Sequence, residues 1–363
     1  MTRTLDGQAL VYCDGAFNTP NGKTAHGLVR FTERYEVKGI IDHTYSGKDA
    51  GQVLDGTPNG IMVYSTVDQA LETAQDLGWI LEYFVIGLAP DGGKLPPKAR
   101  EVVTKALTNG LNIDSGLHDF LSDDEEISLL AKSQGRQIRD IRKTPPRSSL
   151  HFFSGEIEKV DSLVIAVLGT DSAVGKRTTA WLLVHGLRKA GISAELVGTG
   201  QTAWMQGAKY SFVLDSLIND FVAGEIEHGV VSAWKDGAEV IVIEGQGSLM
   251  NPAYPGGFEI LAAGRPDCIV LQHAPARKEY DGFPGYLLHP IERQIEALDI
   301  IGGKPVVAIT INHENLTETG VKQAAIDLTS RTRLPAFDVL LNGSKPLVDL
   351  IIEFRKNHPK PAL

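Results

Sequence analysis

The chain of 363 residues is 42% hydrophobic and 22% charged, as expected for a soluble globular protein with room for two domain cores. A formal net charge of −10 at pH 7 excludes a broadly basic surface, so we expect no nucleic-acid partner. The two cysteines exclude a disulfide framework, no apolar run reaches ~18 residues, and the N-terminus lacks a signal-like apolar core. We therefore expect a cytoplasmic protein that binds neither a membrane nor a metal.

The first 150 residues alternate between strand-like and helix-like patterns. Short apolar runs predict strands at 9–13, 37–42, 61–64, 83–88 and 111–115, and helical patterns follow at 67–77, 96–109 and 123–133. This βα repetition is typical of a parallel sheet with helices on its faces. Residues 139–154 are rich in proline, serine and basic side chains, which indicates a crossover between domains. We therefore predict an α/β fold with two parallel-sheet domains, residues 1–150 and 151–363.

The second half begins a new βα series with a phosphate-binding loop. Its predicted strands are 163–169, 193–198, 239–244, 267–272, 305–311 and 335–340, and the longest predicted helix is 212–234. The first strand ends in a glycine-rich loop that leads into a helix, which is the context a phosphate loop needs. We expect this loop to bind the cofactor through Gly169, Thr170, Asp171, Ser172, Ala173, Val174, Gly175, Lys176, Arg177, Thr178 and Thr179.

The loop departs from the common phosphate-loop pattern in two ways. Five residues separate Gly169 from Gly175, where four are usual, and Arg177 stands where a Ser or Thr normally binds Mg²⁺. Thr178 and Thr179 follow one and two residues late, and the sequence leaves open whether they replace it. The pattern therefore predicts a pyrophosphate site more firmly than a Mg²⁺-dependent nucleotide hydrolase.

Candidate catalytic carboxylates follow in the second half. Glu244 ends the apolar strand 239–244, the place where phosphate-loop folds carry an acid beside the loop. Asp215 and Asp220 fall within the predicted helix 212–234, where they either approach a substrate amine or remain solvated.

Loops at predicted strand ends supply the candidate substrate-binding residues. The segment 273–284 follows a buried strand and contains His273, Arg277 and Lys278; Arg277 could form a fork with a carboxylate. Gln201 lies in the loop 198–202, where ligand binding and a simple turn are equally compatible with the sequence.

The phosphate loop and the segment 243–247 resemble those of dethiobiotin synthetases. More of the chain resembles a family once catalogued only as a domain of unknown function, whose members have been assigned as D-glutamate N-acetyltransferases using acetyl-CoA. The resemblance rests on residues 22–28, 169–179, 200–207, 215–221, 244–249 and 273–275. It implies an N-terminal Rossmann-like domain and a C-terminal phosphate-loop domain. Residues 39–42, 47–51 and 61–71 also look like the CoA-binding domain of acyl-CoA ligases, so two places for coenzyme A stay open.

The leading hypothesis is acetyl transfer from acetyl-CoA to the amino group of D-glutamate, with the phosphate loop holding the CoA pyrophosphate. Glu244 is the first candidate base, with Asp215 or Asp220 as alternatives. The N–H groups of Gly245 and Gly247 are candidates for stabilising the oxyanion. Two alternatives remain: an ATP- and Mg²⁺-dependent ligase or kinase like dethiobiotin synthetase, and a nucleotide-binding regulator without turnover. The expected partner is a small amino-acid substrate, and we expect a homo-oligomer.

Overall fold

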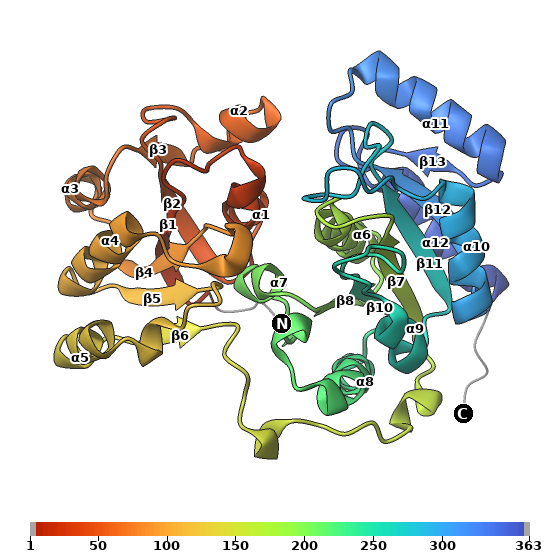
Figure 1. The fold of residues 1–363 in the computed structure, drawn as a ribbon, viewed down its shortest axis with the longest axis horizontal. Helices are drawn as coiled ribbons and strands as arrows, with labels where there is room; N and C mark the ends of the chain where they lie inside the picture. Colours follow the sequence, from red (N-terminus) through yellow and green to blue (C-terminus); the bar gives the residue numbers. More distant parts are fainter. Residues whose placement is uncertain (1–4, 359–363) are drawn as a thin grey trace. The chain divides into compact units, whose positions relative to one another are not determined.

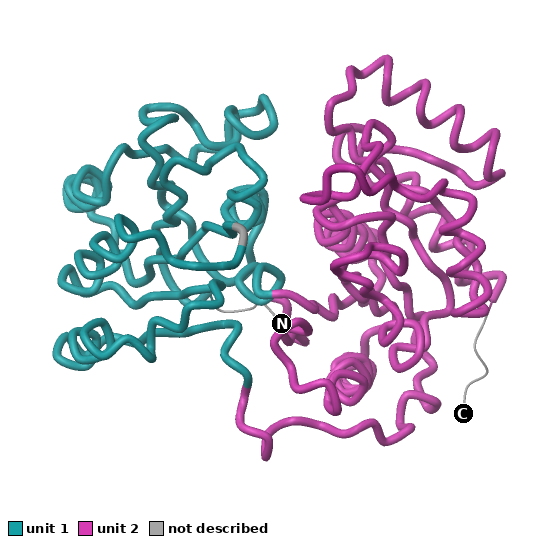
Figure 2. Tube along the Cα trace, viewed as in Figure 1, with its two compact units in different colours: residues 1–144, 201–207 teal, residues 145–200, 208–363 magenta. Residues whose placement is uncertain are grey.

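The computed structural model describes residues 5–358 and contains two compact units, each built on a parallel sheet (Figures 1 and 2). Residues 1–144 and 201–207 form the first unit, and residues 145–200 and 208–363 form the second. The α/β class and the two parallel sheets predicted from the βα repetition are confirmed. Among the helices of residues 5–358, none combines the length and apolar character needed to cross a bilayer.

The sheet of the first unit has the strand order β3-β2-β1-β4-β5-β6, with every neighbouring pair parallel. This is the order of a Rossmann fold, in which the chain reverses direction across the sheet between β1 and β4. The strands are β1 (Gly7–Tyr12), β2 (Tyr35–Ile41), β3 (Met62–Tyr64), β4 (Leu81–Ile86), β5 (Asn112–Ser115) and β6 (Ile138–Asp140). The helices are α1 (Lys23–Arg30), α2 (Ala50–Asp55), α3 (Val67–Leu77), α4 (Pro97–Thr108) and α5 (Glu125–Ser133).

The sheet of the second unit has the order β13-β12-β11-β7-β10-β8-β9, again all parallel. The strands are β7 (Leu163–Gly169), β8 (Ala194–Gly198), β9 (Tyr210–Ser211), β10 (Val240–Glu244), β11 (Cys268–His273), β12 (Val306–Ile311) and β13 (Ala336–Phe337). The helices are α6 (Lys176–Lys189), α8 (Asn219–Lys235), α9 (Phe258–Gly264), α10 (Ile291–Gly302), α11 (Glu318–Thr332) and α12 (Lys345–Asn357).

The central strand of this second sheet explains where its site lies. β7 is buried along its whole length, as its unbroken apolar sequence requires. Its neighbours are β10 on one side and β11 on the other, so the loops that follow all three strands meet at one edge of the sheet. Helices α8, α9 and α10 pack on one face of the sheet, while α12 packs against α6.

A short helix, α7 (Gln201–Met205), departs from the predicted domain boundaries. The division at residue 150 assigned it to the second domain, but it belongs to the first unit although β8 and β9 on either side belong to the second. Met205 is fully buried in the core of the first unit, and Arg34 lies 3.7 Å above the ring centre of Trp204. The Gln206 side chain donates to the carbonyl oxygens of two residues, Gly27 and Phe31. The chain therefore crosses between the units at 144/145, 200/201 and 207/208.

Candidate functional site

The phosphate loop joins β7 to α6 in the geometry that anion binding requires. Gly175, at the helix N-cap, has a φ of 102°, a left-handed conformation that side chains rarely adopt. Within residues 5–358, no side chain caps α6, so its first turn presents backbone N–H groups and the positive end of the helix dipole. A Cβ on Gly169 would lie 2.9 Å from Cδ of Lys176, so a larger residue there would require the Lys176 side chain to shift.

Lys176 connects the phosphate loop to the loop after β10. Its ammonium group donates to the carbonyl oxygen of Asp171 at 2.7 Å and to that of Gly247 at 2.8 Å. The residue is only 7% exposed, so the charge is held inside the site rather than in bulk water. A cation in this position interacts strongly with an anion brought to the loop.

Asp171 is the buried centre of the loop. Its carboxylate accepts hydrogen bonds from the backbone N–H groups of Ser172 and Asp281, and from the side chains of Asn251 and Arg277. These donors come from three separate loops, so the carboxylate fixes those loops to one another. Asn251 is 1% exposed, and the sequence analysis did not identify it because its only signal is its place seven residues after Glu244.

Arg277 has a different environment from the one expected of a substrate fork. The guanidinium pairs with Asp171 at 3.0 Å and with Glu314 at 2.7 Å, and it also donates to the carbonyl oxygen of Ser172. The side chain is 12% exposed. Its observed contacts therefore hold the phosphate loop in shape, and its substrate-binding role stays a prediction.

Glu244 lies at the end of β10, next to the phosphate-loop strand. One carboxylate oxygen accepts from the N–H of Thr199 at 3.0 Å, and the Thr199 hydroxyl donates to the Glu244 carbonyl oxygen. Gln246 in turn donates to that hydroxyl. Burial raises the pKa of Glu244 above its usual 4.5, although the charges of Arg177 and Lys176 and the Thr199 N–H oppose this shift. The result is a desolvated carboxylate beside two cations.

The residues after Lys176 do not provide a Mg²⁺ ligand in the usual position. Arg177 occupies that position, and Thr179 is buried with its hydroxyl donating to the side-chain oxygen of Gln272. The donor set therefore fits a diphosphate bound by N–H groups and cations better than a metal-bound triphosphate. Thr178 is half-buried on the first turn of α6.

His273 ends β11 beside the loop. Its Nδ1 lies 2.9 Å from the hydroxyl of Thr170, which is fully buried. Burial lowers the pKa of His273 to about 4, with a smaller contribution from the charge of Arg331. The ring is therefore neutral at physiological pH and can act as a hydrogen-bonding group, but it is a weak base.

The two glycines proposed as oxyanion donors differ in the structure. The N–H of Gly245 already donates to the carbonyl oxygen of Val167, so it is not available to a ligand. This corrects the prediction and leaves Gly247 as the candidate. Gly247 has a φ of 47°, and a Cβ there would lie 2.0 Å from the carbonyl oxygen of Tyr254. Only glycine fits this position.

The other predicted residues lie on separate elements. Asp215 is in a 3₁₀ turn, Leu214–Ser216, and Asp220 is in the first turn of α8, which begins at Asn219. The prediction that one helix carries both was wrong, because the chain is extended at residues 217–218 between the two elements. Both carboxylates and Lys278 are exposed. Gln201 begins α7 and therefore belongs to the first unit.

Comparison with known proteins identifies both domains. The family model described as the domain of unknown function DUF1611_C, a P-loop domain, matches residues 151–348, and the DUF1611_N Rossmann-like domain matches residues 43–144. A crystal structure of a DUF1611 family protein from Anabaena variabilis is similar over 95% of this chain and 99% of its own, with a TM-score of 0.86 and 27% identity.

Two curated relatives have the name D-glutamate N-acetyltransferase. The protein from Tritonibacter scottomollicae is 30% identical over 78% of this chain and 84% of its own. The protein from a Pseudoalteromonas species is also 30% identical, over 80% of this chain and 87% of its own. The matches cover both domains, and this chain belongs to the DUF1611 family, in which a Rossmann-like domain precedes a P-loop domain.

Proposed function

We propose that this protein transfers the acetyl group of acetyl-CoA to the amino group of D-glutamate. The observation that carries the proposal is its similarity to two proteins named D-glutamate N-acetyltransferase over 78% and 80% of this chain. The site supports the same reaction, because it combines a diphosphate-type anion site with a buried carboxylate and lacks the usual Mg²⁺-binding hydroxyl.

The phosphate loop would hold the pyrophosphate of CoA. The first-turn N–H groups of α6 and the ammonium of Lys176 are the donors, and Arg177 adds a second positive charge. Asp171 and Arg277 keep the loop in this conformation through their ion pair.

Glu244 would act as the base. The substrate ammonium loses a proton to the carboxylate, and the free amine attacks the thioester carbonyl. A carbon–nitrogen bond forms, the carbon–sulfur bond breaks, and the CoA thiolate takes up the second proton of the attacking nitrogen and leaves as the thiol. A raised pKa makes the Glu244 carboxylate a stronger base than an exposed one, and the N–H of Gly247 can donate to the oxyanion.

The experiment measures thiol release from acetyl-CoA with D-glutamate and L-glutamate as separate acceptors, each with and without EDTA. We expect release with D-glutamate that is unchanged by EDTA. No release with either acceptor would reject the proposal. Phosphate release from ATP that EDTA abolishes would instead support the ligase or kinase reaction.

A further inference from the structure

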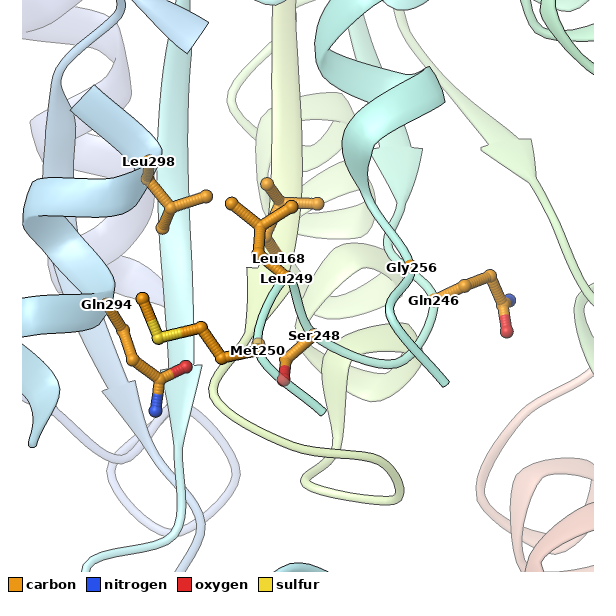
Figure 3. Close-up of a pocket in the computed structure, with 9 residues that line it drawn as sticks. Leu168, Gln246, Ser248, Leu249, Met250, Gly256, Gln294 and Leu298 are labelled. Atoms are coloured by element: carbon orange, nitrogen blue, oxygen red, sulfur yellow. The ribbon is translucent and has the colours of Figure 1, made fainter. Parts of the chain in front are cut away.

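A small pocket adjoins the phosphate loop on the face of the sheet covered by α9 and α10 (Figure 3). Its apolar wall comes from the side chains of Leu168, Leu249, Met250 and Leu298, and Gly169 belongs both to this wall and to the start of the loop. The cavity has a volume of about 10 Å³, which is near the minimum for one water-sized group. It therefore has room for a single methyl-sized group next to the anion site.

Ser248 adds an observation that points to a ligand. It lines this pocket, it is 2% exposed, and its buried hydroxyl has no hydrogen-bond partner among the described residues. A buried hydroxyl without a hydrogen-bond partner destabilises the folded protein, so such a group usually indicates a missing partner. The pocket wall combines apolar side chains with the amides of Gln246 and Gln294, and a partner that fits it carries a polar atom close to apolar carbon.

Coenzyme A has this combination next to its diphosphate. The carbon chain on the pantetheine side starts with a methylene, continues with a carbon that bears two methyl groups, and then carries a hydroxyl. In ATP, the corresponding end of the diphosphate carries another phosphate, which an apolar wall does not favour. The branched carbon is only a few bonds from the nearer phosphorus atom of the diphosphate. A diphosphate on the phosphate loop therefore brings this carbon near Gly169.

We propose that this pocket is the subsite for the branched, hydroxylated segment of coenzyme A that follows its diphosphate. One methyl group enters the space between Leu168, Leu249 and Met250, and the Ser248 hydroxyl bonds to the oxygen of the same segment. The inference rests on the proposed use of acetyl-CoA, and it makes the pocket the feature that selects CoA over other nucleotides at this loop.

The test compares the binding of CoA with that of 3′-phospho-ADP, which keeps the diphosphate but lacks the branched segment. Titration calorimetry of the full chain measures both ligands for Ser248→Ala, which removes the hydroxyl, and for Ser248→Thr, which adds a methyl group to the small pocket. We expect each variant to bind CoA about tenfold more weakly and 3′-phospho-ADP within about twofold of wild type. Ser330→Ala, an exposed serine on α11, is the matched control and should change neither affinity.

The outcomes separate this inference from the proposed function. If wild type transfers acetyl groups but both Ser248 variants keep the wild-type ratio of the two affinities, the subsite is rejected and the function stands. An equal loss for both ligands also rejects the subsite, because the effect would then act on the phosphate loop. Failure of wild type to bind CoA overturns the function and the subsite together. Thermal unfolding checks both variants, and Ser248→Ala alone decides if Ser248→Thr does not fold.

Discussion

Each unit begins its sheet with a central strand and a loop into a helix, but the two loops differ in how their interior is filled. In the first unit, the loop between β1 and α1 places Phe17 inside, with 1% of its surface exposed. Its N–H donates to Asp42, whose other oxygen accepts from the N–H groups of Thr44 and Tyr45. In the second unit, the loop between β7 and α6 ends in Gly175, whose φ of 102° is left-handed, whereas Gly22 at the start of α1 has a φ of −91°. Neither helix start has a side-chain cap among the described residues, so the difference lies in the backbone of the loop and not in the capping.

The comparison separates the strand order of a fold from the chemistry at its strand ends. In dinucleotide-binding Rossmann folds, an acid at the end of the second strand binds the ribose hydroxyls. Asp42 follows β2 in the corresponding place, but it is fully buried and its oxygens serve the backbone of the neighbouring loops. The first unit therefore has the Rossmann strand order, but its strand-end acid, Asp42, serves the backbone. In the second unit, the strand-end acid Glu244 lies beside the cations Arg177 and Lys176.

The largest expected effect distinguishes these two strand-end acids. Glu244→Gln removes the proposed base, so we expect kcat for acetyl transfer to fall by about 10²–10⁴-fold. Asp42→Asn is the matched control; it is expected to lower the free energy of unfolding by about 1–3 kcal/mol and to leave kcat of the folded enzyme unchanged. Steady-state kinetics and thermal unfolding measure both. A normal kcat in Glu244→Gln would remove Glu244 from the chemistry.

The same variant, Glu244→Gln, should also change the thermal stability of the protein at neutral pH. Because the pKa of Glu244 is raised in the folded protein, its contribution to stability is present below pH 4.5 and declines as pH rises through the folded pKa. Neutral glutamine avoids that loss, so Glu244→Gln should unfold at a higher temperature than wild type at pH 7. Equal stability at pH 7 would contradict the raised pKa.

The second prediction compares the lysines at the two helix starts. Lys176→Ala removes a buried ammonium from the proposed diphosphate site, and we expect affinity for CoA to fall by about 10–100-fold. Lys23→Ala changes the first residue of α1, where the side chain is exposed, and should alter CoA affinity by less than about twofold. If Lys23→Ala causes the larger loss of CoA affinity, coenzyme A binds in the first unit. The roles of the two loops would then be the reverse of those proposed.

The sequence was sufficient for the parts of the fold that depend on local patterns. The apolar run of β7, its glycine loop and the helix after it were all predictable, because neighbouring residues determine them. The assignment of α7 to the first unit could not be predicted. This helix has only five residues, and its Trp204 and Met205 contact residues some 170 positions away in the sequence. The role of Asn251 was equally hidden, because its bond to Asp171 joins loops 80 residues apart.

The third prediction concerns the ion pair between Arg277 and Asp171, which holds the phosphate loop in its conformation. Arg277→Met breaks the pair with Asp171 and leaves a fully buried carboxylate with one donor fewer, which should destabilise the second unit by about 3 kcal/mol. We expect KM for acetyl-CoA to rise several-fold and KM for D-glutamate to stay unchanged. Lys278→Met, at the exposed neighbour, should not affect stability. A rise in KM for D-glutamate without loss of stability in Arg277→Met would instead support the carboxylate fork.

The smallest expected effect is in the pH profile of acetyl transfer. This profile tests whether the Glu244 carboxylate of the second unit controls the pH dependence of the activity. Acetyl transfer should decrease on the acid side as Glu244 takes up its proton, and the midpoint should lie above pH 4.5 because burial raises that pKa. His273 has a pKa of about 4 and stays neutral over this range, so His273→Gln should leave the midpoint in place even if kcat changes. His43→Gln, in the loop after β2, is the control from the first unit. A midpoint that moves in His273→Gln would assign the titration to that ring instead of Glu244, and the contrast between the two strand-end acids would then no longer explain the chemistry.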